Sequence, residues 1–171
     1  MQSTSDSKDS LKGSVLTADL RAPWLITSLM LLALVVYVII CLVLGEKLQQ
    51  PLASDLREFI KSVLYGCAII TFPLAGLLRF ILLRLNQTMP LPDEQADPIK
   101  FACSRYLRTV LVSAALFESI GLYGLIMFVL GDGYNTLSIF TGLAALGLLL
   151  YRPKQHELTT LCNALAEMQA H

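Results

Sequence analysis

The chain has 171 residues, of which 55% are hydrophobic and 15% are charged. Soluble proteins typically have about 45–50% and about 25%, so this composition argues against a soluble globule and against a disordered chain. The 13 basic residues are balanced by 13 acidic ones, which excludes the basic excess expected of a nucleic-acid-binding protein. The length fits one domain, and the composition predicts a small membrane protein with several spans.

Long uncharged runs predict where the chain crosses the membrane. They follow Arg21, Lys61, Arg108 and Asp132 and have 24, 17, 23 and 19 residues, and the third is interrupted by one charge, Glu118. A hydrocarbon core about 30 Å thick requires about 20 apolar residues of helix. We therefore expect an all-α fold, a four-helix transmembrane bundle, with spans near residues 23–45, 62–84, 108–130 and 135–151.

The remaining segments divide the chain into three parts. Residues 1–22 are polar and Ser-rich, which is typical of a flexible cytoplasmic N-terminal arm. Residues 23–151 form the expected transmembrane domain, and Ser54 predicts a helical lead-in that continues into the second span. In residues 152–171, apolar side chains recur at helical spacing, which predicts an amphipathic cytoplasmic tail helix lying on the membrane or on the bundle.

The distribution of Lys and Arg predicts the orientation. Ten lie in the N-terminal arm, the connection near 79–108 and the tail, whereas three lie in the loop 46–61. Because cytoplasmic loops carry the excess of positive charge, we expect both termini in the cytoplasm. The chain is then a multi-pass integral protein of the cell membrane, meaning an inner or plasma membrane.

The residue types exclude several chemistries. The histidines are His156 and His171, both in the tail, so an intramembrane haem or metal site held by histidines is excluded, as is a Ser–His pair within the bilayer. The cysteines are scattered and expected to be free, although Cys41 and Cys67 lie at similar depths and a contact between them is the alternative. We expect no cofactor, no metal and no enzymatic activity.

Glu118 lies near the middle of the third span, where burying a charged carboxylate in the bilayer costs several kcal/mol. A carboxyl group there is normally turned into the bundle and is often functional. We take Glu118, Arg79 and Thr141 as candidate ion- or proton-binding residues. In one hypothesis Arg79 pairs with Glu118, and in the other Arg79 reaches toward lipid headgroups with Arg84 while Glu118 stays neutral and hydrogen-bonded.

Small residues predict the contact between the third and fourth spans. The short turn at 131–133 makes these spans antiparallel neighbours, and small side chains allow helices to approach closely. The expected packing face consists of Ala114, Ala115 and Gly121 on the third span and Ser138, Gly142 and Ala145 on the fourth.

The stretch Phe117-Glu118-Ser119-Ile120-Gly121-Leu122-Tyr123-Gly124-Leu125-Ile126 resembles the ion-binding helix of rotary ATPase proteolipid subunits, the c-ring family. That family places a carboxylate at mid-membrane before a Tyr-Gly-hydrophobic run. The expected direction of the third span, from the cytoplasm to the outside, agrees with that of the family. The resemblance covers about ten of the 171 residues. It implies that Glu118 is a proton-binding carboxylate.

Two functions follow from these observations. The first is a non-enzymatic integral membrane protein of structural, assembly or accessory type. The second is a proton- or cation-coupled transport or translocation component that uses Glu118. In either case the expected partners are the lipid bilayer and further copies of the chain or a larger membrane complex, and no nucleic acid.

Overall fold

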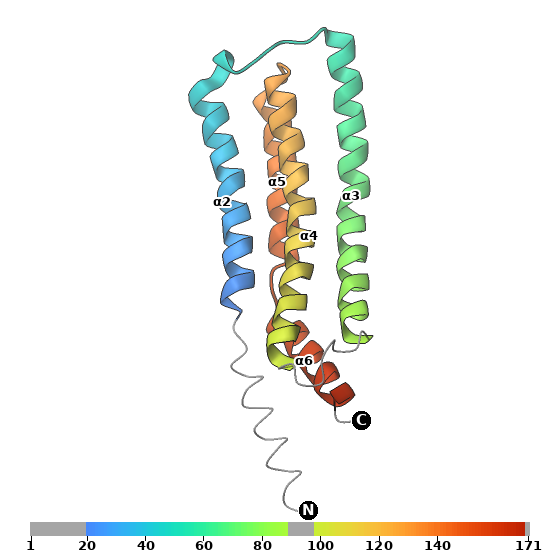
Figure 1. Ribbon diagram of the computed structural model, residues 1–171. Coiled ribbons are helices and arrows are strands. Elements are labelled where there is room, and N and C mark those ends of the chain that lie inside the picture. Colours follow the sequence, from blue (N-terminus) through green and yellow to red (C-terminus); the bar gives the residue numbers. More distant parts are fainter. Residues whose placement is uncertain (1–19, 89–97, 170–171) are drawn as a thin grey trace, which may run out of the picture.

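The computed structural model describes residues 20–88 and 98–169, and all regular secondary structure in this part of the chain is helical. Four long helices run along a common axis, and a fifth lies across one end of them (Figure 1). The helix α4 contacts all the other α-helices and forms the centre of the bundle. The elements in chain order are α2 (Arg21–Leu44), a 3₁₀ turn (Gly45–Lys47), α3 (Ser54–Thr88), α4 (Pro98–Val129), α5 (Tyr134–Leu150) and α6 (Gln155–Gln169).

The expectation of an all-α fold is confirmed for the described residues, and α3 and α4 extend well beyond their predicted spans whereas α2 and α5 match theirs to within two residues. The lead-in is helical, because α3 begins at Ser54 and continues without a break through Pro73. Helix α4 begins ten residues before its predicted span, at Pro98, whose fixed φ suits a first helical position. The predicted flexible arm lies outside the described residues up to residue 19, and Arg21 already belongs to α2.

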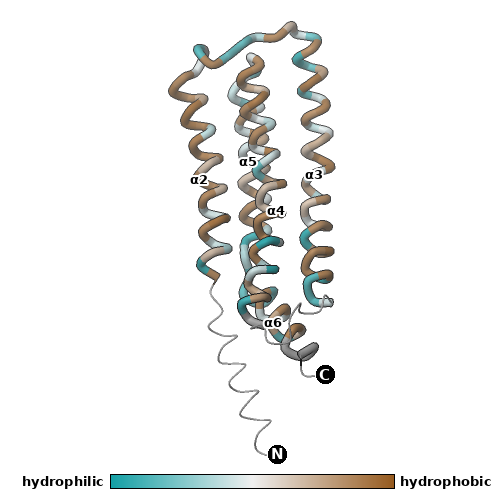
Figure 2. Tube along the Cα trace, in the orientation of Figure 1, coloured by the Kyte–Doolittle hydropathy of each residue, from teal (hydrophilic) through white to brown (hydrophobic). Residues whose placement is uncertain are grey.

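Three helices are long and apolar enough to cross a membrane: α2, α3 and the part of α4 from Lys100 to Val129. With 17 residues, α5 is shorter, and it reaches spanning length only with the segment Gln155–Leu165 of α6, from which a bend of 48° separates it. Counting this bent pair gives four. Hydrophobic residues occupy most of α2 and α3, with hydrophilic residues gathered toward their ends (Figure 2).

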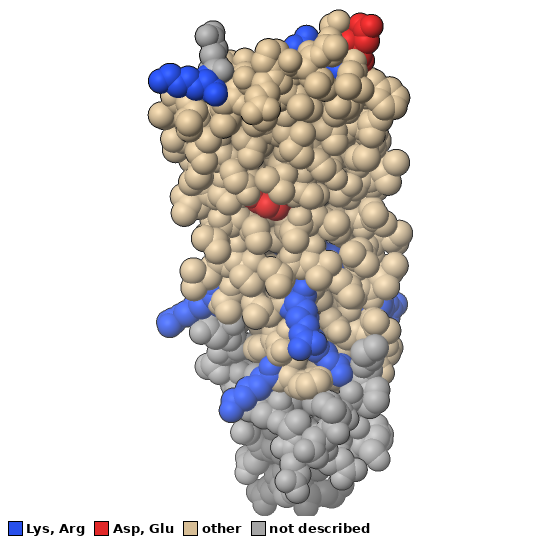
Figure 3. Space-filling model, turned by 45° about the horizontal axis from the view of Figure 1, so that its top comes forward, with Lys and Arg blue, Asp and Glu red and all other residues tan. Residues whose placement is uncertain are grey.

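The outer surface of the bundle is apolar. Only 17% of the most apolar stretch of α2 and of α3 is buried within the chain, compared with 50% for α4. On the face seen in Figure 3, charged atoms gather toward the two ends, and a small acidic area interrupts the uncharged middle. Soluble monomeric proteins rarely expose an apolar surface of this size. The surface therefore indicates contact with lipid or with other membrane helices.

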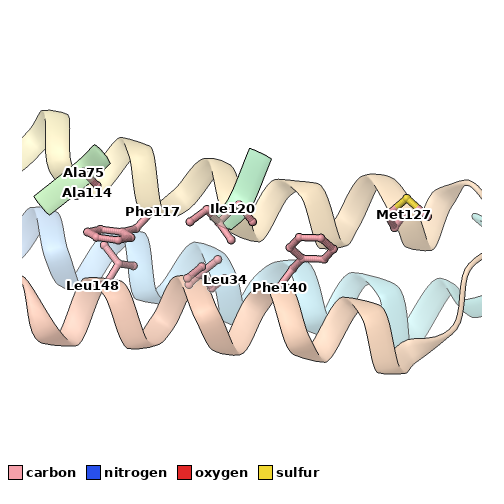
Figure 4. Close-up of a cluster of buried hydrophobic side chains, with 10 residues drawn as sticks. Leu34, Ala75, Ala114, Phe117, Ile120, Met127, Phe140 and Leu148 are labelled. Carbon is pink, nitrogen blue, oxygen red and sulfur yellow. The ribbon is translucent and has the colours of Figure 1, made fainter. Parts of the chain in front are cut away.

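The core is a row of apolar side chains between α2, α4 and α5. Buried there along the bundle axis are Phe117 beside Leu148, then Ile120 beside Leu34, and then Phe140 (Figure 4). The Phe117 ring also meets aromatic rings from α3 and from the end of α5, with centroid distances of 5.4 and 5.2 Å. These contacts hold the ring in one place.

The face of α5 that packs against α4 differs from the predicted one. Ser138 and Gly142 are exposed and Ala145 is only half-buried, and a Cβ added at Gly142 would meet no atom within 4 Å. The close approach is instead at Gly147, where a Cβ would overlap the Phe117 ring. On α4, Ala114 and Gly121 are buried as expected, whereas Ala115 is exposed.

The end of the bundle opposite α6 is closed by the loop 48–53. Its backbone N–H groups donate to the last carbonyls of α4 at 2.7 and 3.2 Å. Arg57 Nη1 donates to the Gly131 carbonyl at 2.9 Å, and Lys61 Nζ lies 3.0 Å from the Asp132 carboxylate. These contacts tie α3 to the turn between α4 and α5.

We predict that Gly147→Ala destabilises the protein by about 1–3 kcal/mol, the usual cost of overpacking, because the Phe117 ring cannot easily yield. Gly142→Ala is the matched control and should leave stability unchanged or slightly higher, since alanine favours helix. Thermal unfolding in detergent measures both. Equal unfolding midpoints for Gly147→Ala and the wild type would show that this contact is not tight.

Candidate functional site

Arg79 on α3 is a buried cation, with 4% of its side chain exposed. Its Nη2 donates to the Glu157 carboxylate of α6 at 2.6 Å. Its Nη1 donates to the Tyr151 carbonyl at 2.6 Å and lies 3.4 Å from the Ser113 hydroxyl of α4. The guanidinium therefore joins α3, α4, the end of α5 and α6. We call these four residues the arginine cluster.

The ends of two helices explain why a cation and an anion meet here. Tyr151 follows the last residue of α5, and carbonyls at a helix C-terminus lack intrahelical donors and favour positive charge. Glu157 lies in the first turn of α6, where negative charge is favoured. Arg79 thus caps one helix and pairs with the acidic start of the next.

Tyr106 of α4 adds a second fixing point for α6. Its hydroxyl accepts a hydrogen bond from the Lys154 N–H at 2.8 Å and lies 3.1 Å from Glu157 Oε2. Beside these polar contacts, Leu158, Leu161 and Leu165 are buried against apolar side chains of α4. The tail is therefore an amphipathic helix whose apolar face lies on the bundle.

Glu118 is buried on α4, with 8% of the residue exposed. Gly121, one turn later on the same helix, closely approaches Leu34 of α2, and the Tyr37 hydroxyl of α2 is near enough to interact with the carboxyl group. Neither carboxyl oxygen has a hydrogen-bond partner among the described residues. The Glu118 carboxyl group is therefore buried within the bundle, and its hydrogen-bonding capacity is unused among the described residues.

The structure does not bring the three predicted site residues together. Arg79 turns inward, as one of the two hypotheses expected, but its partner is Glu157 and not Glu118. The Thr141 hydroxyl on α5 is buried and also lacks a described partner, and no hydrogen bond joins it to Glu118. Elsewhere in the described residues, no group of three His, Cys, Asp or Glu side chains is placed to hold a metal ion.

Sequence reasoning missed Glu157, Tyr106 and Ser113. The available signal was the helical spacing of Leu158, Leu161 and Leu165, which predicts an apolar face but does not say what it covers. Once that face lies on α4, Glu157 comes to the side of Arg79.

No protein-family model, curated protein or solved structure matches the chain significantly.

We predict that Glu157→Gln and Arg79→Gln each lower stability by about 3–5 kcal/mol, the usual cost of leaving one partner of a buried ion pair alone. The double variant should lose less than the sum of the two, since each change removes the same interaction. Arg84→Gln is the control, because Arg84 lies on the same helix and is exposed. Additive losses in detergent unfolding would contradict the pairing.

Proposed function

We propose that the protein is a non-enzymatic, multi-pass integral membrane protein of structural, assembly or accessory type, with both termini in the cytoplasm. The observation that carries this proposal is the apolar outer surface of α2 and α3, of which 17% is buried within the chain. A surface of this kind suits contact with lipid and with other membrane helices.

The polar side chains around Arg79 are hydrogen-bonded to one another, which supports a role without catalysis. Arg79, Glu157, Tyr106 and Ser113 hold one another and the helix ends, so their hydrogen-bonding capacity is used to fix α6. A catalytic constellation instead presents its groups to a substrate in an accessible site.

Extraction of the tagged chain from its native membrane in mild detergent tests the accessory role. We expect the protein component of the particle, measured by light scattering, to exceed the 18.8 kDa of one chain, because the apolar faces bind further copies or other chains. A particle of one chain at every detergent concentration would contradict the proposal. Carbonate extraction tests membrane integration separately, and release into the soluble fraction would overturn it.

The orientation gives an independent prediction. The start of α2, the end of α3, the start of α4 and α6 all lie at one end of the bundle (Figure 1). Reporter tags at Met1 and His171 should therefore report the same side, which the excess of Lys and Arg predicts to be the cytoplasm, and a tag at residue 49 should report the opposite side. Opposite compartments for the two terminal tags would mean an odd number of spans.

A second candidate function is proton- or cation-coupled transport. It is favoured by the buried carboxyl group of Glu118, whose oxygens form no hydrogen bond with a described residue. A carboxyl group can take up and release a proton, so this residue has the chemistry that proton transport needs. The resemblance of residues 117–126 to proteolipid ion-binding helices points the same way.

Proton flux into liposomes containing the purified protein separates the two functions. The accessory role predicts no flux above that of empty liposomes. Transport predicts flux that Glu118→Gln abolishes, since the amide cannot exchange a proton, and that Glu58→Gln, at an exposed site on α3, leaves intact. Flux lost in Glu118→Gln alone would replace the accessory role with transport.

A further inference from the structure

Two adjoining cavities lie between α3 and α6. One has a volume of about 210 Å³ and the other about 300 Å³, and Phe80, Leu83 and Glu157 line both. Because three residues line both, we name the two cavities together the α3–α6 groove.

The floor of the groove is apolar and opens outward. Phe80 is 60% exposed, and Leu150 extends the apolar lining toward the end of α5. An exposed phenylalanine on a membrane-facing helix suits contact with a hydrocarbon chain and offers nothing to a soluble, fully polar ligand.

The rim of the groove is cationic. Arg84 lines the larger cavity and Lys154 the smaller one. Both side chains are exposed, and neither forms an ion pair with a described residue. The acidic residue in the lining, Glu157, is already neutralised by Arg79 at 2.6 Å, so among the described residues Arg84 and Lys154 give the groove a net positive charge.

We propose that the α3–α6 groove binds one anionic phospholipid, with the phosphate at Arg84 and Lys154 and an acyl chain along Phe80 and Leu83. Basic pockets between helices at the cytoplasmic face are suited to anionic headgroups, and the apolar floor supplies the second half of an amphiphile's requirements. The inference rests on the membrane orientation proposed above, which carbonate extraction and the terminal tags test independently.

Native mass spectrometry of the purified full-length protein tests this site with three probes: dioleoyl phosphatidylglycerol, dioleoyl phosphatidylcholine and glycerol phosphate. We expect one molecule of phosphatidylglycerol to bind and to raise the unfolding midpoint, and the other two to bind at least tenfold more weakly. Arg84→Gln with Lys154→Gln should weaken phosphatidylglycerol binding about tenfold or more, since each cation near an anionic headgroup contributes about 1 kcal/mol.

The matched control removes two exposed cations outside the groove, Lys47→Gln with Arg152→Gln, and should leave lipid binding unchanged. A second variant, Thr160→Trp, fills the larger cavity without changing charge and should also weaken binding. The proposal would be overturned if phosphatidylglycerol and phosphatidylcholine bound equally well, or if the groove variants bound phosphatidylglycerol as well as the wild type. It would also be overturned if glycerol phosphate bound as tightly as phosphatidylglycerol.

Discussion

The contacts of the buried Arg79 guanidinium are the interaction on which the α6 end of this bundle depends. A lone cation in such a place would cost several kcal/mol. Here it has an anionic partner in Glu157 at 2.6 Å and the uncapped Tyr151 carbonyl at 2.6 Å. Because these groups come from α6 and from the end of α5, the charge is satisfied only when the chain bends after α5 and α6 lies against α4. The cation thus selects one arrangement of the tail.

The two ends of the bundle are secured in different ways. At the α6 end, the arginine cluster and a small apolar cluster fix the last helix. At the opposite end, loop hydrogen bonds and the Lys61–Asp132 ion pair join α3 to the turn between α4 and α5. Between them, most helix contacts are apolar, and Glu118 is a buried carboxyl group near Tyr37 whose oxygens form no hydrogen bond with a described residue. Polar chemistry is therefore available at one mid-depth position and at the α3–α6 groove.

The spans were predictable because charge is costly in a bilayer and leaves long uncharged runs in the sequence. The rotation of each helix about its own axis was not predictable from the sequence. Small residues lie on both inward and outward faces, so Gly142 resembled a contact residue although Gly147, about 140° further round at 100° per residue, is the one that meets Phe117. An inward Arg79 was one of two hypotheses, and its partner depends on where the tail folds back, which no local pattern contains.

Hydrogen exchange of the backbone amides of α6 tests the central role of Arg79 most directly. In the wild-type protein we expect the amides of residues 158–165 to exchange slowly, close to the rate of the buried part of α4. In Arg79→Gln they should exchange far faster while the middle of α4 keeps its protection, because α6 loses its anchor and the remaining bundle does not. Unchanged protection of α6 in this variant would show that its apolar face alone holds it in place, and would contradict the account.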